Sequence, residues 1–404
     1  MNYKQKIEQA DDFVFDKRLY IIFLISFTEV LGFSMVLPLI PYLGEEFGLT
    51  FSQIGLIVSL FSVCQLFASP ITGKLSDHFG RKPLFILSQL STFVGFVFLG
   101  LATTVVLLIV ARLIDGLLGS NMTVSQAYIS DITEPKHRTR VYSYSSGVFG
   151  AGLIFGPFIG AILSTINYSV PMFFAAAITL VSIALVILFL PETIPKKTEE
   201  ISLRFNDVIP IDNVKHFVRT HHIRNRLVMF FIYTMAFFLF ISNLSLLGIA
   251  QFHITASQVS FYMVWIGLIR VGVQTVLIAR ILRFFGENRV LFIGVFSMII
   301  SMVTLVFSTE YLFVFVPLVF LAFGTGVGRP ILTSRLANSV TQKETGAILG
   351  VNNALTSVAQ IIAPIFGGFI IEYLAPQTLP LLSAIIFTLL ILFLRNTTKN
   401  NPDG

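Results

Sequence analysis

Long apolar runs are the feature that most restricts how this chain can fold. A helix that spans a bilayer needs about 20 mostly apolar residues. The 404-residue chain contains twelve such runs, which are rich in Leu, Ile and Phe and lack the alternation of barrel strands. The sequence therefore predicts an all-α integral membrane protein with twelve transmembrane helices. The runs lie at roughly 19–43, 52–72, 83–102, 104–129, 141–164, 169–190, 225–248, 257–279, 288–308, 311–334, 346–370 and 378–395.

Composition leads to the same class. Only 12% of the residues are charged and 55% are hydrophobic, whereas a soluble domain carries about 25% charged residues. The net charge of +6 comes from basic residues in short segments between the runs, which argues against a nucleic-acid partner. The single cysteine, Cys64, excludes an internal disulfide. The polar N-terminus lacks a cleavable signal pattern, so we expect the first run to remain as a span.

The charges of the loops predict the orientation. Lys and Arg occur in alternate loops, and the remaining loops carry Glu45, Glu46, Glu310 and Glu372 but no Lys or Arg. Positively charged loops stay on the cytoplasmic side of a membrane. We therefore expect a multi-pass protein of the cell membrane with both termini in the cytoplasm.

The chain divides into two similar parts. Residues 191–224 form the only long polar stretch between runs, and we expect them to be a cytoplasmic central loop. This loop separates a six-helix N-terminal half, 1–190, from a six-helix C-terminal half, 225–404. GKLSDHFGRKPLFI aligns with ARILRFFGENRVLFI at an offset of 206 residues. Duplicated halves are typical of secondary transporters, whose substrate site lies between the repeats near the midplane.

Three motifs resemble those of the major facilitator superfamily. GKLSDHFGRKPLF resembles the signature that follows its second helix, and RLIDG resembles a fourth-helix motif with Asp115 in place of Gln. The run from Gly152 resembles the fifth-helix motif of proton-coupled exporters, although Ser143 and Ala161 depart from it. PLIPYL and LPET add likeness to the tetracycline and multidrug proton antiporters, a twelve-span drug efflux group. The residues that match the first and third motifs are Gly73, Leu75, Asp77, Gly80, Arg81 and Lys82, and Gly152, Gly156, Pro157 and Gly160.

The resemblance implies a role for the first motif. In the superfamily, the residue that matches Asp77 faces the eleventh helix of the other half. The residue that matches Arg81 pairs with an acid at the end of the fourth helix, where Asp131 stands here. The cluster would then be a conformational latch that holds the outward-open state; the alternative is an anchor of basic residues that only fixes topology. We expect Gly73 and Gly80 to form a tight turn between two helix ends.

Some charged residues lie within the apolar runs, where an unpaired charge costs roughly 2.5–3.5 kcal/mol. Arg112 and Asp115 are three residues apart and share a helix face, so they either neutralise one another or take part in coupling. Glu29 has no local partner and is the best candidate for a proton-carrying or substrate-facing acid. Arg270 is a candidate partner for Glu29 or for another acid across the cavity. Gln65, Asn352 and Asn353 either line the cavity or join helices by hydrogen bonds.

No motif indicates an enzyme, a cofactor or a metal. GTGVG at 324–328 lacks the setting of a phosphate loop, and the histidines of the central loop have no cysteine partner. We expect a monomeric secondary transporter that exports hydrophobic or amphipathic drugs in exchange for protons by alternating access. The alternatives are an exporter of a sugar, glycolipid or other metabolite with the same fold, and a non-transporting membrane receptor or enzyme.

Overall fold

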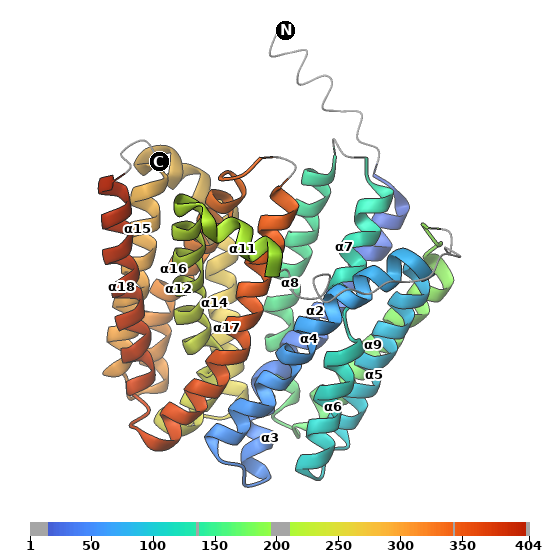
Figure 1. The fold of residues 1–404 in the computed structure, drawn as a ribbon. Helices are drawn as coiled ribbons and strands as arrows, with labels where there is room; N and C mark the ends of the chain where they lie inside the picture. Colours follow the sequence, from blue (N-terminus) through green and yellow to red (C-terminus); the bar gives the residue numbers. More distant parts are fainter. Residues whose placement is uncertain (1–14, 135–136, 195–210, 342–343, 401–404) are drawn as a thin grey trace.

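The computed structural model describes residues 15–134, 137–194, 211–341 and 344–400, so part of the predicted central loop, 195–210, lies outside the described residues. The described chain is helical and contains no strand. The first helix begins and the last helix ends at one face, which we call the terminal face; the other we call the opposite face (Figure 1). The helices before the central loop are α2 (Lys17–Val36), α3 (Ile40–Glu46), α4 (Phe51–Phe79), α5 (Arg81–Gly100), α6 (Val105–Leu118), α7 (Asn121–Ile132), α8 (Arg138–Leu163) and α9 (Ser169–Phe189).

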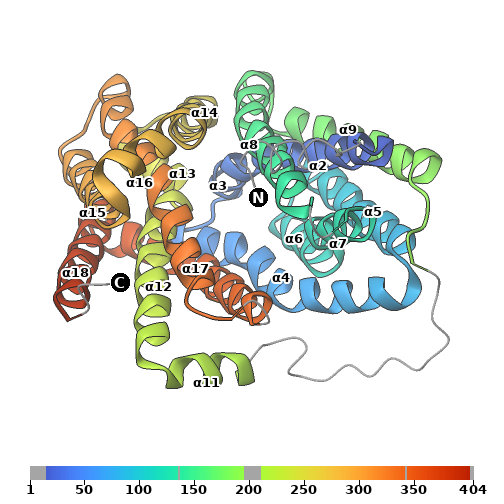
Figure 2. The ribbon, with the colours of Figure 1, turned by 90° about the horizontal axis from the view of Figure 1, so that it is seen from above.

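The helices after that loop begin with the short α11 (Ile211–Arg219). They continue as α12 (His221–Ile241), α13 (Leu244–Leu247), α14 (Ala256–Gly272), α15 (Ile278–Val306), α16 (Tyr311–Ala337), α17 (Thr345–Tyr373) and α18 (Thr378–Asn400). We call α2–α9 the N-terminal helix group and α12–α18 the C-terminal helix group. Most helices contact mainly members of their own group, whereas α17 contacts α4 of the other group most extensively, and the groups lie side by side in Figure 2.

Eleven stretches of the described chain are long and apolar enough to cross a membrane. One of them, Ala256–Val306, has 51 residues. A straight helix of that size would be about 76 Å long, more than twice the ~30 Å thickness of a bilayer core. The stretch contains the eighth and ninth predicted runs. A π-helical turn at Val273–Leu277 lies within the eighth run, and a kink at Gly286 lies between the two runs. The membrane-spanning all-α class is confirmed, whereas the count of twelve spans stays a prediction.

Two glycines with positive φ interrupt the helices at matching places in the two groups. Gly80 has φ +101° between α4 and α5, and Gly286 has φ +73° within α15. Both values fall in the region that favours glycine, and the two positions match in the sequence repeat. Gly73 does not contribute to the turn, so this expectation was wrong. It lies inside α4, which continues to Phe79, and a Cβ there would be 3.4 Å from Thr123, an ordinary contact.

The two helix groups meet along two seams, α4 with α17 and α8 with α14 (Figure 2). The hydrogen bonds that join the groups between described residues lie towards the opposite face. The Tyr42 hydroxyl donates to the Ile254 carbonyl at 2.9 Å, and the Ser52 amide donates to Glu372 Oε2 at 2.8 Å. The Ser245 hydroxyl binds the Pro38 carbonyl at 3.0 Å. The described contacts therefore fasten the groups more firmly at the opposite face than at the terminal face.

Candidate functional site

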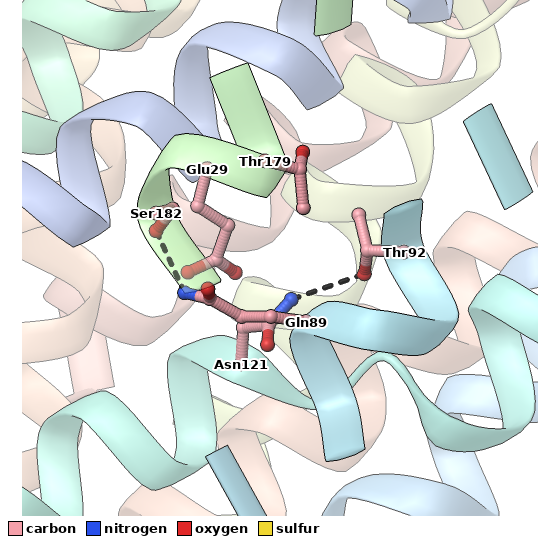
Figure 3. Close-up of a pocket in the computed structure, with 6 residues that line it drawn as sticks. All are labelled: Glu29, Gln89, Thr92, Asn121, Thr179 and Ser182. Atoms are coloured by element: carbon pink, nitrogen blue, oxygen red, sulfur yellow. Dashed lines mark hydrogen bonds between the residues drawn. The ribbon is translucent and has the colours of Figure 1, made fainter. Parts of the chain in front are cut away.

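Glu29 lies on α2 in a polar pocket inside the N-terminal helix group (Figure 3). The other lining residues come from α5, α7 and α9, and the space between them does not admit a water molecule. They are all uncharged: Gln89, Thr92, Asn121, Thr179 and Ser182. Sequence reasoning identified Glu29 but not this lining, because Ser, Thr and Gln within an apolar run give no signal of which helix face they occupy.

Three oxygen atoms of the pocket have no hydrogen-bond partner among the described residues. The Gln89 amide donates to the Ser182 hydroxyl at 2.9 Å, and the Asn121 amide donates to the Thr92 hydroxyl at 3.1 Å. Glu29 Oε2 and the amide oxygens of Gln89 and Asn121 have no hydrogen-bond partner. A protonated carboxyl can donate a hydrogen bond, whereas a carboxylate can only accept. The unpartnered amide oxygens near Glu29 therefore suit a protonated carboxyl, which could donate to one of them.

Asp115 and Arg112 lie near this pocket on α6. Arg112 Nη2 is 3.6 Å from Asp115 Oδ2, which is within ion-pair reach but too far for a hydrogen bond, and both side chains are buried. The chain leaves the helix directly after them, at Gly119, whose amide binds the Asp115 carbonyl at 2.8 Å. The charge of Asp115 lies close enough to interact electrostatically with the carboxyl of Glu29. The N-terminal group thus holds two carboxyl groups that influence one another and one arginine that partly balances them.

Gln65 supports the same break in the chain. Its amide donates to the Gly119 carbonyl at 2.8 Å, and its oxygen accepts from the Ser69 hydroxyl at 2.8 Å. Gln65 therefore joins α4 to the end of α6. In the C-terminal group, Asn352 is buried with an unpartnered amide oxygen, whereas its neighbour Asn353 is exposed.

The structure does not bring Arg270 to Glu29. Arg270 lies on α14 in the C-terminal group, where its charge acts on Arg329 of α16 and on the phenol of Tyr233 of α12. Sequence reasoning missed Arg329, although one arginine in the apolar stretch GTGVGRPIL is a signal of the same kind as Arg270. The nearby Trp265 joins α14 to α16, because its indole N–H donates to the Phe315 carbonyl at 3.1 Å.

The charge cluster around Arg81 ties four helix ends together at the terminal face: those of α4, α5, α7 and α9. Arg81 is buried; its guanidinium pairs with Asp77 at 2.5 Å and with Asp131, at the end of α7, at 2.8 Å. Glu192, after α9, accepts hydrogen bonds from the backbone amides of Arg81 and Lys82 at 2.8 and 3.0 Å. A carboxylate at the start of α5 is favoured by the free N–H groups and the helix dipole. Sequence reasoning missed Glu192, although it stands in the quoted LPET stretch.

The glycine motif of α8 packs against α2. A Cβ at Gly152, Gly156 or Gly160 would come within 3.0 Å of α2 atoms, and the Ser34 hydroxyl donates to the Gly152 carbonyl at 2.9 Å. The motif therefore lies at a contact inside the N-terminal group. Pro157 is accommodated within the continuous helix Arg138–Leu163.

Neither a metal centre nor a catalytic set emerges from these residues; in the described part of the chain, no group of His, Cys, Asp and Glu is arranged to hold a metal ion. The long apolar helices and the buried charges inside two packed groups define a multi-pass membrane transporter. Residues 22–308 match the Major Facilitator Superfamily, and residues 226–403 match it a second time. The chain therefore belongs to the Major Facilitator Superfamily; it is a transporter and not an enzyme.

Similar proteins support the assignment to this family. The chain is 27% identical over 383 residues to the tetracycline resistance protein, class H, of Pasteurella multocida, covering 93% of this chain and 95% of that protein. It is 30% identical over 353 residues to multidrug resistance protein 1 of Bacillus subtilis (strain 168), covering 86% and 87%. The human organic anion transporter MFSD10 has a similar fold, with a TM-score of 0.70 at 22% identity, covering 93% of this chain and 98% of that one.

Proposed function

We propose that the protein is a proton-coupled exporter of hydrophobic or amphipathic drugs. The observation that carries the proposal is Glu29, whose carboxyl lies in a closed polar pocket with an unpartnered oxygen and within the influence of Asp115. Ionisable groups inside a membrane are costly and usually serve transport or proton relay. The names of the tetracycline and multidrug resistance relatives support a drug as the substrate.

The same proposal includes the arrangement in the membrane. Residues 1–190 and 225–404 act as two halves joined by a cytoplasmic loop at 191–224, in a monomer of the cell membrane with both termini in the cytoplasm. The terminal face is then cytoplasmic, and the hydrogen bonds between the helix groups lie on the external side. This placement supports an inward-facing state, from which a substrate enters from the cytoplasm.

Transport is tested in everted membrane vesicles with an imposed pH gradient. Tetracycline, norfloxacin, ethidium and a sugar are offered in parallel, and we expect accumulation of at least one of the three drugs and none of the sugar. Glu29→Gln should abolish accumulation, whereas Glu310→Gln, at an exposed loop position, should not. Accumulation of the sugar alone would favour a metabolite exporter.

The coupling group is tested separately by substrate-induced proton release from purified protein in detergent. Glu29→Gln should retain binding but release no protons. Asp115→Asn should still release protons and should impair transport more mildly, because it mainly leaves Arg112 without its partner. Proton release from Glu29→Gln but not from Asp115→Asn would reverse the roles of the two acids. Release from both variants would place coupling elsewhere.

A further inference from the structure

Arg270 and Arg329 are two arginines of the C-terminal helix group without an acid beside them. Their charges act on one another and on Tyr233, so the three side chains share one neighbourhood. Within the ranges that the structure describes, no Asp or Glu forms an ion pair with either arginine. The neighbourhood thus carries two positive charges and no described negative charge.

Close helix packing places these groups inside the helix group rather than towards lipid. A Cβ at Gly326 of α16 would lie 2.9 Å from Val273, at the end of α14. A Cβ at Gly328 would lie 2.7 Å from the Tyr233 ring of α12. The backbone of α16 therefore touches both neighbours next to Arg329. Both arginines are partly exposed.

The arginines at the terminal ends of both groups show how this chain usually balances such charges. Arg81 pairs with Asp77 and Asp131, and Arg335 pairs with Glu287 at 2.5 Å. An unpaired charge at membrane depth is unfavourable and usually faces a partner or a transport pathway. Two neighbouring arginines without an acid lack that partner in the described chain, and an anion would supply it.

We propose that Arg270, Arg329 and Tyr233 bind the oxyanion of an amphipathic compound, most simply a carboxylate, while its apolar part contacts the surrounding helices. Planar guanidinium groups bind carboxylates through paired hydrogen bonds. The Tyr233 hydroxyl has no hydrogen-bond partner and is available to donate. This inference rests on the proposed transport function, and it names the chemical class of the exported substrate. The phosphate of an anionic lipid shares this chemistry and must be distinguished.

The test is equilibrium dialysis of the purified full chain in a neutral maltoside detergent, with norfloxacin and its methyl ester as probes and empty micelles as background. The acid should bind the wild-type protein about tenfold more tightly than the ester, the equivalent of ~1.4 kcal/mol. Arg270→Gln and Arg329→Gln should each weaken binding of the acid about tenfold and leave binding of the ester unchanged. Retained ester binding also shows that the variants are folded.

Further variants keep the test decisive. Arg283→Gln removes an exposed arginine near the start of α15, and it should leave the affinities for the acid and for the ester unchanged. If a Gln variant fails to fold, Arg270→Lys and Tyr233→Phe replace it. Each of these variants should weaken binding of the acid more than binding of the ester. Equal binding of acid and ester by the wild type, or parallel loss of both in the variants, would overturn the proposal.

A lipid arm separates the two sources of the oxyanion. Phosphatidylglycerol added to the micelles should leave norfloxacin binding unchanged; displacement of the acid but not of the ester would assign the site to a lipid headgroup and overturn the substrate class. Dialysis uses no pH gradient. If the protein still binds the acid more tightly than the ester but shows no proton-driven transport, the exporter function is therefore rejected and the anion site is retained.

Discussion

Asp16 shows how one side chain fixes the start of a membrane helix. Its carboxylate accepts from the Arg18 amide at 2.8 Å and from Arg18 Nε at 2.9 Å, directly before the first turn of α2. The side-chain hydrogen bond from Arg18 holds the pKa of Asp16 below its ordinary value. A carboxyl whose pKa is lowered by folding stabilises the fold above its unfolded pKa of about 3.9. This stabilisation is lost as the pH falls through the lower, folded value.

This cap predicts a pH effect confined to the start of α2. Hydrogen-exchange protection of its first-turn amides should fall when the pH is lowered from about 7 to about 3. Asp16→Ala should lose about 1 kcal/mol of local protection already at neutral pH, whereas Asp16→Asn should keep most of it. The first turn of α14 is an internal control, because it is capped by Thr255 and Gln258, which do not titrate in this range. Unchanged protection of α2 across this range would contradict the role of the cap.

At the residue scale, the sequence most readily identifies functional candidates among the charged residues. Glu29 and Arg270 stand out because a charge inside an apolar run is rare, and the same criterion, applied fully, identifies Arg329. The partners are harder to predict. Gln89 and Ser182 beside Glu29, and Tyr233 beside Arg270, come from helices far apart in the sequence, and only the packed structure brings them together.

The glycines of α8 place a tight requirement on its sequence. A Cβ at Gly156 would lie 2.0 Å from the Ser34 hydroxyl and 2.6 Å from the Leu31 carbonyl, both on α2. Backbone atoms cannot move aside as a flexible side chain can. Gly147 lies in the same helix, and a Cβ there would meet nothing within 4 Å.

This contrast predicts opposite effects of one substitution at two positions. Gly156→Ala should destabilise the protein by about 1–3 kcal/mol because it overpacks the contact with α2. Gly147→Ala should stabilise it by up to about 1 kcal/mol through helix propensity. Thermal unfolding in detergent measures both. A neutral Gly156→Ala would mean that α2 and α8 separate easily.

The existence of the helices follows from the sequence more clearly than their ends do. Apolar runs predict a bilayer span, but α4 continues seven residues beyond its run to Phe79, because polar residues remain helical outside the lipid. The predicted run 104–129 instead contains a break at Gly119, between α6 and α7. Hydropathy is insensitive to such a break, because it averages over residues whatever their backbone conformation.

Across the whole molecule, the two helix groups carry ion pairs of reversed sign at matching places. In the N-terminal group, Arg81 at the start of α5 pairs with Asp131 at the end of α7. In the C-terminal group, Glu287 follows the matching glycine, and Arg335 near the end of α16 pairs with it. The sequence repeat predicted matching positions but not this exchange of charge, because Arg335 and Asp131 are not aligned residues.

We propose that the Arg81 cluster acts as the latch of the conformational cycle. Its described contacts lie within the N-terminal group, as expected if the latch between the groups is released in this state. Asp77→Asn and Arg81→Ala should leave the protein inserted but lower transport turnover about tenfold, ~1.4 kcal/mol in the barrier. Substrate affinity should change less than turnover. Glu45→Gln at the opposite face is the control, and normal turnover in both variants would reduce the cluster to a topology anchor.

The chain contains a single tryptophan, Trp265, which joins α14 to α16 and lies on the same helix as Arg270. The ultraviolet emission of tryptophan in the unmodified protein therefore originates from one known place. A change in the spacing of α14 and α16 would alter the hydrogen bond of that indole and shift its emission spectrum. The wild-type transporter thus carries its own optical reporter between α14 and α16, the two helices that hold Arg270 and Arg329, with no need for an attached dye.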